Sequence, residues 1–130
     1  MALTEIRYNT TSTGRTIPHT DEFRVYDNGK VSKTAVYGWL LVAKWGSADL
    51  TSVYAGGLAQ VANGGILTDT SVYSGGRCSA DHTGSAVKTS VFFGGSADVY
   101  SGGSGISTFI YSGGKMSAYD NGRAISTTAH

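Results

Sequence analysis

The sequence predicts an all-β fold: a parallel β-helix (β-solenoid) of about five rungs of 19 residues with Gly-Gly turns. Glycine pairs recur at equivalent places in successive units, and the segments between them are short and rich in Val, Ile, Thr, Tyr and Phe, which favour strands. A fixed period near twenty residues is typical of stacked units that bury their apolar faces only against one another. The period is clearest in five threonines spaced nineteen apart, namely Thr51, Thr70, Thr89, Thr108 and Thr127.

The chain begins with a segment that does not show this repeat. Residues 1–23 hold the only proline, Pro18, and a Thr/Ser run, and we expect them to form an N-terminal cap or tail. Such a cap would cover the exposed strand edge at the end of a solenoid. Residues 24–130 are expected to form the β-solenoid repeat domain, beginning with a half-unit, "VYDNGKVSKT", and a shorter unit over 34–50.

Each full unit reads as strand, turn, strand, turn. The first turn is a glycine pair, which supplies the positive φ that tight turns require. A second turn follows within each unit, for example at Asn63-Gly64-Gly65. The first turns are expected at Gly56-Gly57, Gly75-Gly76, Gly94-Gly95 and Gly113-Gly114.

Alternation along the strands predicts which side chains face inward. On the strand entering each unit, we expect Val87, Thr89 and Val91 inside and Lys88, Ser90 and Phe92 outside. The next units repeat this pattern, with Ile106, Thr108 and Ile110, then Ile125, Thr127 and Ala129, inside. On the second strand, two columns are expected to face inward. The first consists of Leu40, Ala59, Cys78, Ala97 and Met116, and the second of Val42, Val61, Ala80, Val99 and Ala118. The residues between these columns are expected to face outward, namely Leu41, Gln60, Ser79, Asp98 and Ser117.

Composition narrows the class of function. A net charge of +1 without a Lys/Arg cluster argues against nucleic acid as a partner. No segment approaches the eighteen or so apolar residues of a membrane span, so membrane insertion is not expected. The first residues show no apolar signal-peptide core, which keeps a cytoplasmic location open as an alternative. The C-terminal "ISTTAH" ends partway into a unit, which suggests a fragment of a longer solenoid or an end sealed in a homo-oligomer.

The repeats resemble those of a known family. The stretches "TSVYSGG" and "ADVYSGGSGISTFIYSGGKMSAYDNGRA" are similar to the roughly nineteen-residue strand-loop-strand repeats of AIDA-type autotransporter passengers, which include antigen 43-like self-associating adhesins. The resemblance covers about residues 25–130. It implies a right-handed parallel β-helix displayed at the cell surface or outside the cell, with roles in adhesion, autoaggregation or biofilm formation.

An outward row of aromatic residues is the candidate binding surface. Its members stand just before the first turns, and rings stacked at rung spacing would form a flat strip able to bind a glycan or another solenoid. The same row would also serve as a purely structural ladder that stabilises the stack. The row consists of Tyr37, Tyr54, Tyr73, Phe92 and Tyr111, and a shorter row of Tyr26, Tyr100 and Tyr119 stands before the second turns.

The hydroxyl residues allow two further interpretations. A threonine column could match an ice lattice, but its parity places it inside, where we expect the hydroxyls to be satisfied within the stack. Outward serines are what a heptosyltransferase of the resembled family would meet, although a plain solvated face is the better explanation for them. The possible O-glycosylation sites are Ser71, Ser90, Ser107 and Ser126.

The positions of the acidic, histidine and cysteine residues do not indicate a catalytic or metal-binding site. Parallel β-helix enzymes need carboxylates that converge on adjacent rungs, whereas Asp49, Asp69, Asp81, Asp98 and Asp120 occupy different positions in their units. The three histidines, His19, His82 and His130, are also out of register. Cys78 shares a column with alanines and is expected to be a small core residue. We therefore predict no catalytic residues, no metal site and no cofactor.

The sequence thus favours a non-enzymatic adhesion or self-association module whose partners are a glycan, a protein surface or a like solenoid. The alternative is a small stand-alone solenoid, intracellular or phage-borne, that acts as a protein-interaction or inhibitor module.

Overall fold

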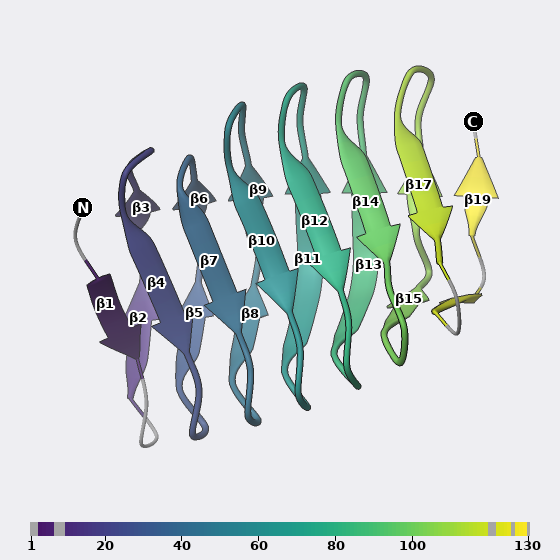
Figure 1. Ribbon diagram of the computed structural model, residues 1–130. Helices are drawn as coiled ribbons and strands as arrows, with labels where there is room; N and C mark the ends of the chain where they lie inside the picture. Colours follow the sequence, from purple (N-terminus) through teal and green to yellow (C-terminus); the bar gives the residue numbers. More distant parts are fainter. Residues whose placement is uncertain (1–2, 7–9, 120–121, 126, 130) are drawn as a thin grey trace.

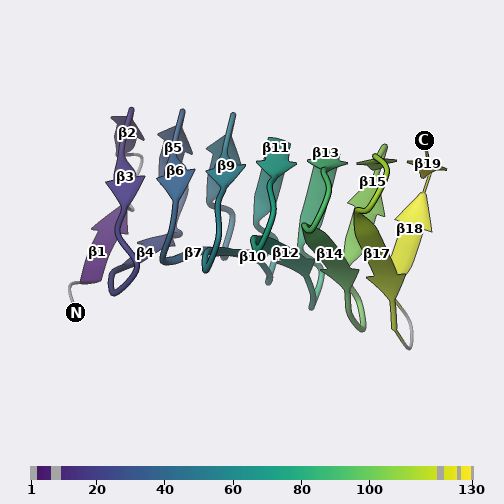
Figure 2. The same cartoon turned by 90° about the horizontal axis from the view of Figure 1, so that it is seen from above.

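The computed structural model describes residues 3–6, 10–119, 122–125 and 127–129 and shows a parallel β-solenoid (Figure 1). The chain winds through about six rungs, and the N- and C-terminal parts lie at opposite ends of the stack. The predicted fold class is confirmed, with one rung more than the sequence suggested. Two layers of strands face each other along the whole length (Figure 2).

One wall is a seven-stranded parallel sheet, here called sheet A. Its neighbours pair in register, so that Leu58 lies beside Arg77 and Ala59 beside Cys78. In order across the sheet, the strands are β1 (Leu3–Ile6), β4 (Glu22–Val25), β7 (Trp39–Val42), β10 (Leu58–Val61), β12 (Arg77–Ala80), β14 (Ser96–Val99) and β17 (Lys115–Ala118).

The opposite layer, sheet B, has twelve strands because most rungs break in two at a bend. Only β11 (Ile66–Val72) and β13 (Ser85–Val91) continue through that bend among the described residues. Before the bend lie β2 (Thr11–Thr13), β5 (Lys30–Ser32), β8 (Ser47–Asp49), β15 (Ser104–Ile106) and β18 (Arg123–Ile125), and after it lie β3 (Thr16–Ile17), β6 (Ala35–Val36), β9 (Ser52–Val53), β16 (Phe109–Ile110) and β19 (Thr128–Ala129).

The strands of the solenoid begin at Leu3 rather than near residue 24. β1 pairs with β4 at a spacing of nineteen residues, with Leu3 beside Glu22, and β3 pairs with β6, with Thr16 beside Ala35. The described parts of the segment predicted as a cap or tail, residues 3–6 and 10–23, therefore contribute strands in register with the next rung. The repeat is not recognisable in this part of the sequence because the glycine pair is missing. The first turn contains Pro18, His19 and Thr20 instead.

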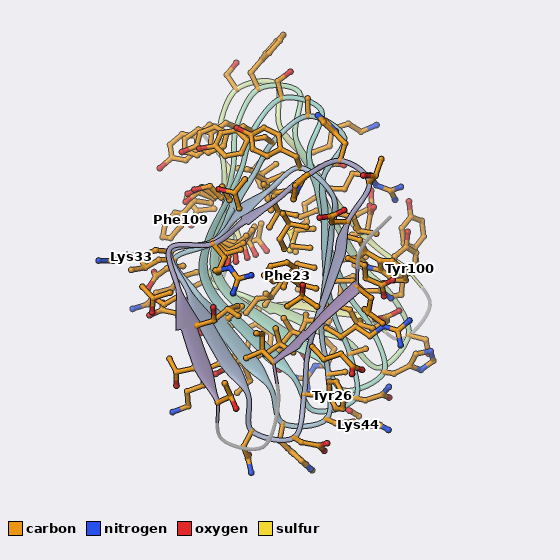
Figure 3. All side chains as sticks on the ribbon, turned by 90° about the vertical axis from the view of Figure 1, so that its left-hand side faces the viewer. Phe23, Tyr26, Lys33, Lys44, Tyr100 and Phe109 are labelled. Carbon is orange, nitrogen blue, oxygen red and sulfur yellow. The ribbon has the colours of Figure 1, made fainter. Side chains whose placement is uncertain are left out.

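The core consists of columns of small and branched side chains that stack from rung to rung. Val25, Val42 and Val61 are wholly buried in one column of sheet A, and Leu40 and Ala59 in the next. Phe23 projects into the interior at the same place in the view along the axis (Figure 3). The predicted inward columns of sheet A are confirmed, although Met116 is only half-buried and Ala118 is exposed. Of the positions between them, Ser79 and Asp98 are buried by neighbouring side chains despite their outward register.

The bend in sheet B overturns part of the predicted alternation. Lys88 has φ of 59°, in the left-handed region, and this conformation reverses which side of the strand the preceding residues face. Ala86 is therefore buried and Val87 only half-buried, while Thr89 and Val91 lie inside as predicted. The same reversal turns Ile106 and Ile125 away from the core. The residues that occupy this corner in successive rungs are Lys33, Leu50, Asp69, Lys88 and Ser107, all with positive φ.

The glycine pairs of the first turns have two separate roles. Gly75 has φ of 82°, as the third residue of a type II turn requires, and the turn is closed by a hydrogen bond of 2.8 Å that the Gly76 N–H donates to the Tyr73 carbonyl. Gly76 permits a close approach, because a Cβ there would lie 2.7 Å from the Val53 carbonyl oxygen of the previous rung. The pair thus makes the turn and lets the next rung stack on it.

In the part of the chain that the structure describes, no helix is long and apolar enough to cross a lipid bilayer.

Candidate functional site

The five predicted aromatic residues form one continuous stack, here called the aromatic ladder. Each ring precedes the first turn and follows a buried valine, or the half-buried Ile110 in the case of Tyr111, so in-register stacking of the rungs places all five at one position. The ring centroids of Tyr37 and Tyr54 are 5.0 Å apart, those of Tyr54 and Tyr73 and of Tyr73 and Phe92 are each 5.2 Å apart, and those of Phe92 and Tyr111 are 4.9 Å apart. The interplanar angles fall from 15° to 5° along the row.

Stacking hides the faces of these rings and leaves their edges outside. Tyr73 is 37% exposed and Tyr111 is 39% exposed, whereas the other three rings are half-buried. Each stacked pair contributes about 0.5 to 1.5 kcal/mol beyond its buried area. The ladder therefore stabilises the rungs and also presents an amphipathic edge to solvent.

Further apolar side chains widen this edge over the last rungs. Phe93 is 73% exposed in the turn after Phe92, and Phe109 is 37% exposed on the strand before Tyr111. Together with Tyr73 and Tyr111 they form an exposed surface that we call the aromatic patch. The repeat pattern gives no signal for Phe93, because the other full units carry Ala or Ser at that place in the turn.

A histidine extends the ladder at its other end. The His19 ring lies 5.6 Å from the Tyr37 ring, tilted by 57°. Pro18 occupies the ladder position itself in that rung, so the histidine reaches the stack from the next residue. The contact of His19 with the ladder was not predicted, because residues 1–23 were expected to form a cap or tail.

The shorter aromatic row is only partly formed. Tyr100 and Tyr119 stack with centroids 5.1 Å apart and planes 11° apart. Tyr26 occupies the same column but does not stack with them, since three intervening rungs carry Ala43, Ala62 and Asp81 there. Its hydroxyl instead donates a hydrogen bond of 2.6 Å to Glu5 Oε2. Figure 3 shows Tyr26 and Tyr100 well apart in the view along the axis. The prediction of a three-membered row is thus wrong.

Five threonines of the column lie inside the solenoid, each about 1% exposed, which removes them from any ice-binding surface: Thr34, Thr51, Thr70, Thr89 and Thr108. Thr127 was also predicted to lie inside, and this prediction is wrong because Thr127 is exposed. The expectation that these hydroxyls are satisfied within the stack is wrong for four of the five buried ones. The Oγ1 atoms without a hydrogen-bond partner are those of Thr34, Thr51, Thr70 and Thr89.

The predicted glycosylation sites do not share one row. Ser71 and Ser90 are register partners in an outward column that also contains Ser52, and all three are half-buried. Ser107 stands in the corner column, one rung beyond Lys88. Ser126 lies outside the described residues.

The acidic side chains occupy separate columns, as their sequence positions indicate. Asp98 accepts a hydrogen bond from Arg77, and Asp81 accepts a long one of 3.4 Å from Gln60. Asp69 lies at the corner, and His82 lies in a second turn with φ of 43°. Asp120 and His130 fall outside the described part of the chain. Within that part, no three His, Cys, Asp or Glu side chains are grouped so that they could hold a metal ion.

Cys78 is a core residue. It is 2% exposed between Ala59 and Ala97, and desolvation, with a smaller contribution from the nearby Asp98 carboxylate, raises the pKa of its thiol to about 12. A thiol in this state is a poor nucleophile and a poor metal ligand.

Comparison with known proteins supports the fold. No protein-family model matches the sequence, and no curated protein matches it. Among solved structures, the chain is similar to a fragment of TibA in its TibC-catalysed, hyper-glycosylated form, with a TM-score of 0.53 and 23% sequence identity. The match covers 98% of this chain and 61% of the TibA fragment, so the chain spans about three fifths of that fragment. TibA is an AIDA-type autotransporter adhesin, the group whose repeats the sequence resembles, and this chain shares its β-solenoid fold with rungs of about nineteen residues.

Proposed function

We infer that this solenoid is a non-enzymatic adhesion module that associates with a second copy of itself through the aromatic patch. The observation that carries the proposal is the patch itself, in which Tyr73, Phe93, Phe109 and Tyr111 are all more than a third exposed on three successive rungs. Exposed apolar groups gathered on neighbouring rungs are typical of interaction surfaces on soluble proteins.

A second copy is the occupant that best fits this surface. A column of rings at a spacing near 5 Å is self-complementary, because a twofold axis brings an identical column against it. The net charge of +1 produces little repulsion between copies. The likeness to TibA supports an adhesive role and a location at the cell surface or outside the cell. Association in biofilms is a further part of the proposal.

Sugar addition to the outer face belongs to the same proposal. The TibA fragment is hyper-glycosylated, and Ser71 and Ser90 here form one outward column beside the ladder. Intact-mass measurement of protein from its natural host, compared with a Ser71→Ala/Ser90→Ala variant, tests this part. An unmodified mass for the parent protein would contradict it.

Sedimentation velocity over a range of concentrations tests self-association. The parent chain is expected to associate, and a Tyr73→Ser/Phe93→Ser/Tyr111→Ser variant is expected to remain monomeric. A Tyr100→Ser/Tyr119→Ser variant is the matched control, because it removes a similar stack from a different face. Equal association of all three proteins, or a monomeric parent at every concentration, would overturn the proposal.

A further inference from the structure

One rung is shorter than the others, and the structure shows where the missing residues belong. Strand partners lie nineteen residues apart throughout the described sheets except at this rung, where Glu22 pairs with Trp39 and Ala35 with Ser52, seventeen apart. The rung loses its two residues in the first turn, since Tyr37-Gly38 links β6 to β7 where Tyr54-Ala55-Gly56-Gly57 links β9 to β10. The tight β6–β7 turn can be followed in Figure 1.

The shortened turn leaves a hollow between its two neighbours. In regular rungs, the second residue of the turn covers the first glycine of the next rung, as Ala55 covers Gly75, where an added Cβ would lie 3.0 Å from the Ala55 Cβ. At the short rung that residue is absent, and His19 reaches across to Gly56, whose added Cβ would lie 3.1 Å from the imidazole Nδ1. The space left open has a volume of about 500 Å³.

The hollow has an apolar wall and a polar wall. Trp39 and Leu58 are register partners on β7 and β10, and the indole is 36% exposed. The turn between β3 and β4 adds His19, Thr20 and Asp21 to the lining. The Thr20 hydroxyl donates a long hydrogen bond of 3.4 Å to Asp21 Oδ1.

The Glu22 carboxylate adds little negative charge to the hollow. Glu22 also borders it, but Arg24 Nε donates a hydrogen bond of 2.7 Å to Glu22 Oε2, and Glu22 is only 4% exposed. The ion pair therefore balances the Glu22 carboxylate. An anionic ligand would lie close to the Asp21 carboxylate, and a purely apolar ligand would cover the polar side chains of the lining without offering them hydrogen bonds, which costs free energy.

We propose that this hollow is a binding site for a neutral pyranose, such as the terminal sugar of a glycan. A pyranose has an apolar face of C–H groups, which stacks on an indole, and a rim of hydroxyls that both donate and accept hydrogen bonds. Trp39 and Leu58 provide the first contact, and His19, Thr20 and Asp21 provide the second. The site involves different side chains from the aromatic patch, so either proposal can fail without the other.

Tryptophan fluorescence reports directly on this site once Trp45, which is 72% exposed on a second turn, is replaced. In a Trp45→Phe protein the only remaining indole is Trp39. The probes are the methyl glycosides of glucose, galactose, mannose and N-acetylglucosamine. We expect at least one of them to shift the Trp39 emission in a saturable way, with a dissociation constant of about 1 mM, as suits a single shallow sugar site. In the reverse protein, Trp39→Phe with Trp45 retained, the same sugar is expected to leave the emission unchanged.

Two variants test whether the hollow itself binds the sugar. Inserting Ala-Gly between Tyr37 and Gly38 restores a nineteen-residue rung and fills the hollow, and it is expected to abolish the titration. Asp21→Ala is expected to weaken binding by about tenfold, the effect of a lost hydrogen bond to a charged group. Saturation-transfer NMR follows binding in variants that lack Trp39, and thermal melts confirm that each variant is folded.

The titrations and the insertion variant give different results if the hollow binds a sugar and if it does not. Saturable sugar binding that the insertion removes, with sedimentation behaviour unchanged, supports the site. The proposal is overturned if none of the four glycosides binds, if the inserted protein binds equally well, or if tetramethylammonium binds while the sugars do not.

Discussion

Arg77 Nη2 donates a hydrogen bond of 3.0 Å to Asp98 Oδ2 on the next rung, and this ion pair covers a carboxylate side chain that is only 11% exposed. The contact raises the pKa of the Arg77 guanidinium, chiefly through the hydrogen bond. It ties β12 to β14 on the outer face of sheet A. Asp98 depends on this partner because its side chain has little contact with water.

Arg77→Ala is therefore expected to destabilise the protein by about 1 kcal/mol, mainly because the largely buried Asp98 loses its partner. Urea unfolding measures the change. Lys115→Ala, in the same outward column, is the control and is expected to change stability by less than about 0.5 kcal/mol. Equal effects of the two substitutions would show that the ion pair contributes nothing.

Gly76→Ala is expected to lower the free energy of unfolding by about 2 kcal/mol or more, because the new Cβ meets the Val53 carbonyl oxygen at 2.7 Å. Gly14→Ala is the comparison: that glycine has φ of 72° but nothing within 4 Å of an added Cβ. Its cost is about 1 kcal/mol, from the backbone conformation alone. Thermal melts of both variants should rank them in this order, and the reverse order would contradict the packing of the turns.

Thr70→Val is expected to stabilise the protein by about 1 kcal/mol, since valine has the same shape and the buried Thr70 Oγ1 has no hydrogen-bond partner. The half-buried Thr68, on the same strand, provides the control, with an expected change within about 0.5 kcal/mol. A loss of stability in Thr70→Val would mean that the threonine column has partners, such as ordered water, inside the solenoid.

The Cys78 thiol is expected to resist Ellman's reagent at pH 8 in the native protein and to react fully in denaturant. Burial raises the pKa of this thiol to about 12, so the reactive thiolate is scarce and inaccessible. Fast reaction of the folded protein would contradict its position in the core.

The same pKa shift predicts a loss of stability in alkali. Between about pH 9 and about pH 12 the unfolded thiol ionises while the folded one stays neutral, so the unfolded state binds fewer protons and stability falls as pH rises. Going from pH 8 to pH 10, Cys78→Ala should lose about 1 to 2 kcal/mol less stability than the parent. Identical pH profiles would contradict the shift.

The sequence by itself determined the period and its consequences. Parallel strands stack in register, so a spacing of nineteen residues is enough to place Tyr73 beside Phe92 and Cys78 between alanines. The glycine pairs identified the first turns, because only glycine combines positive φ with close backbone approach. The aromatic ladder was predictable in full for this reason.

Only the tertiary structure decided what the period does not encode. The corner at Lys88 reverses the alternation through a left-handed conformation in ordinary residues, which carry no turn signal, so Ala86 and not Val87 lies in the core. The strands within residues 3–6 and 10–23 pair at the nineteen-residue spacing of the repeat, although their sequence lacks its glycine pair. The sugar-sized hollow arises because residues from three rungs, His19, Trp39 and Leu58, meet where one turn is two residues short, and such a meeting depends on how neighbouring rungs pack.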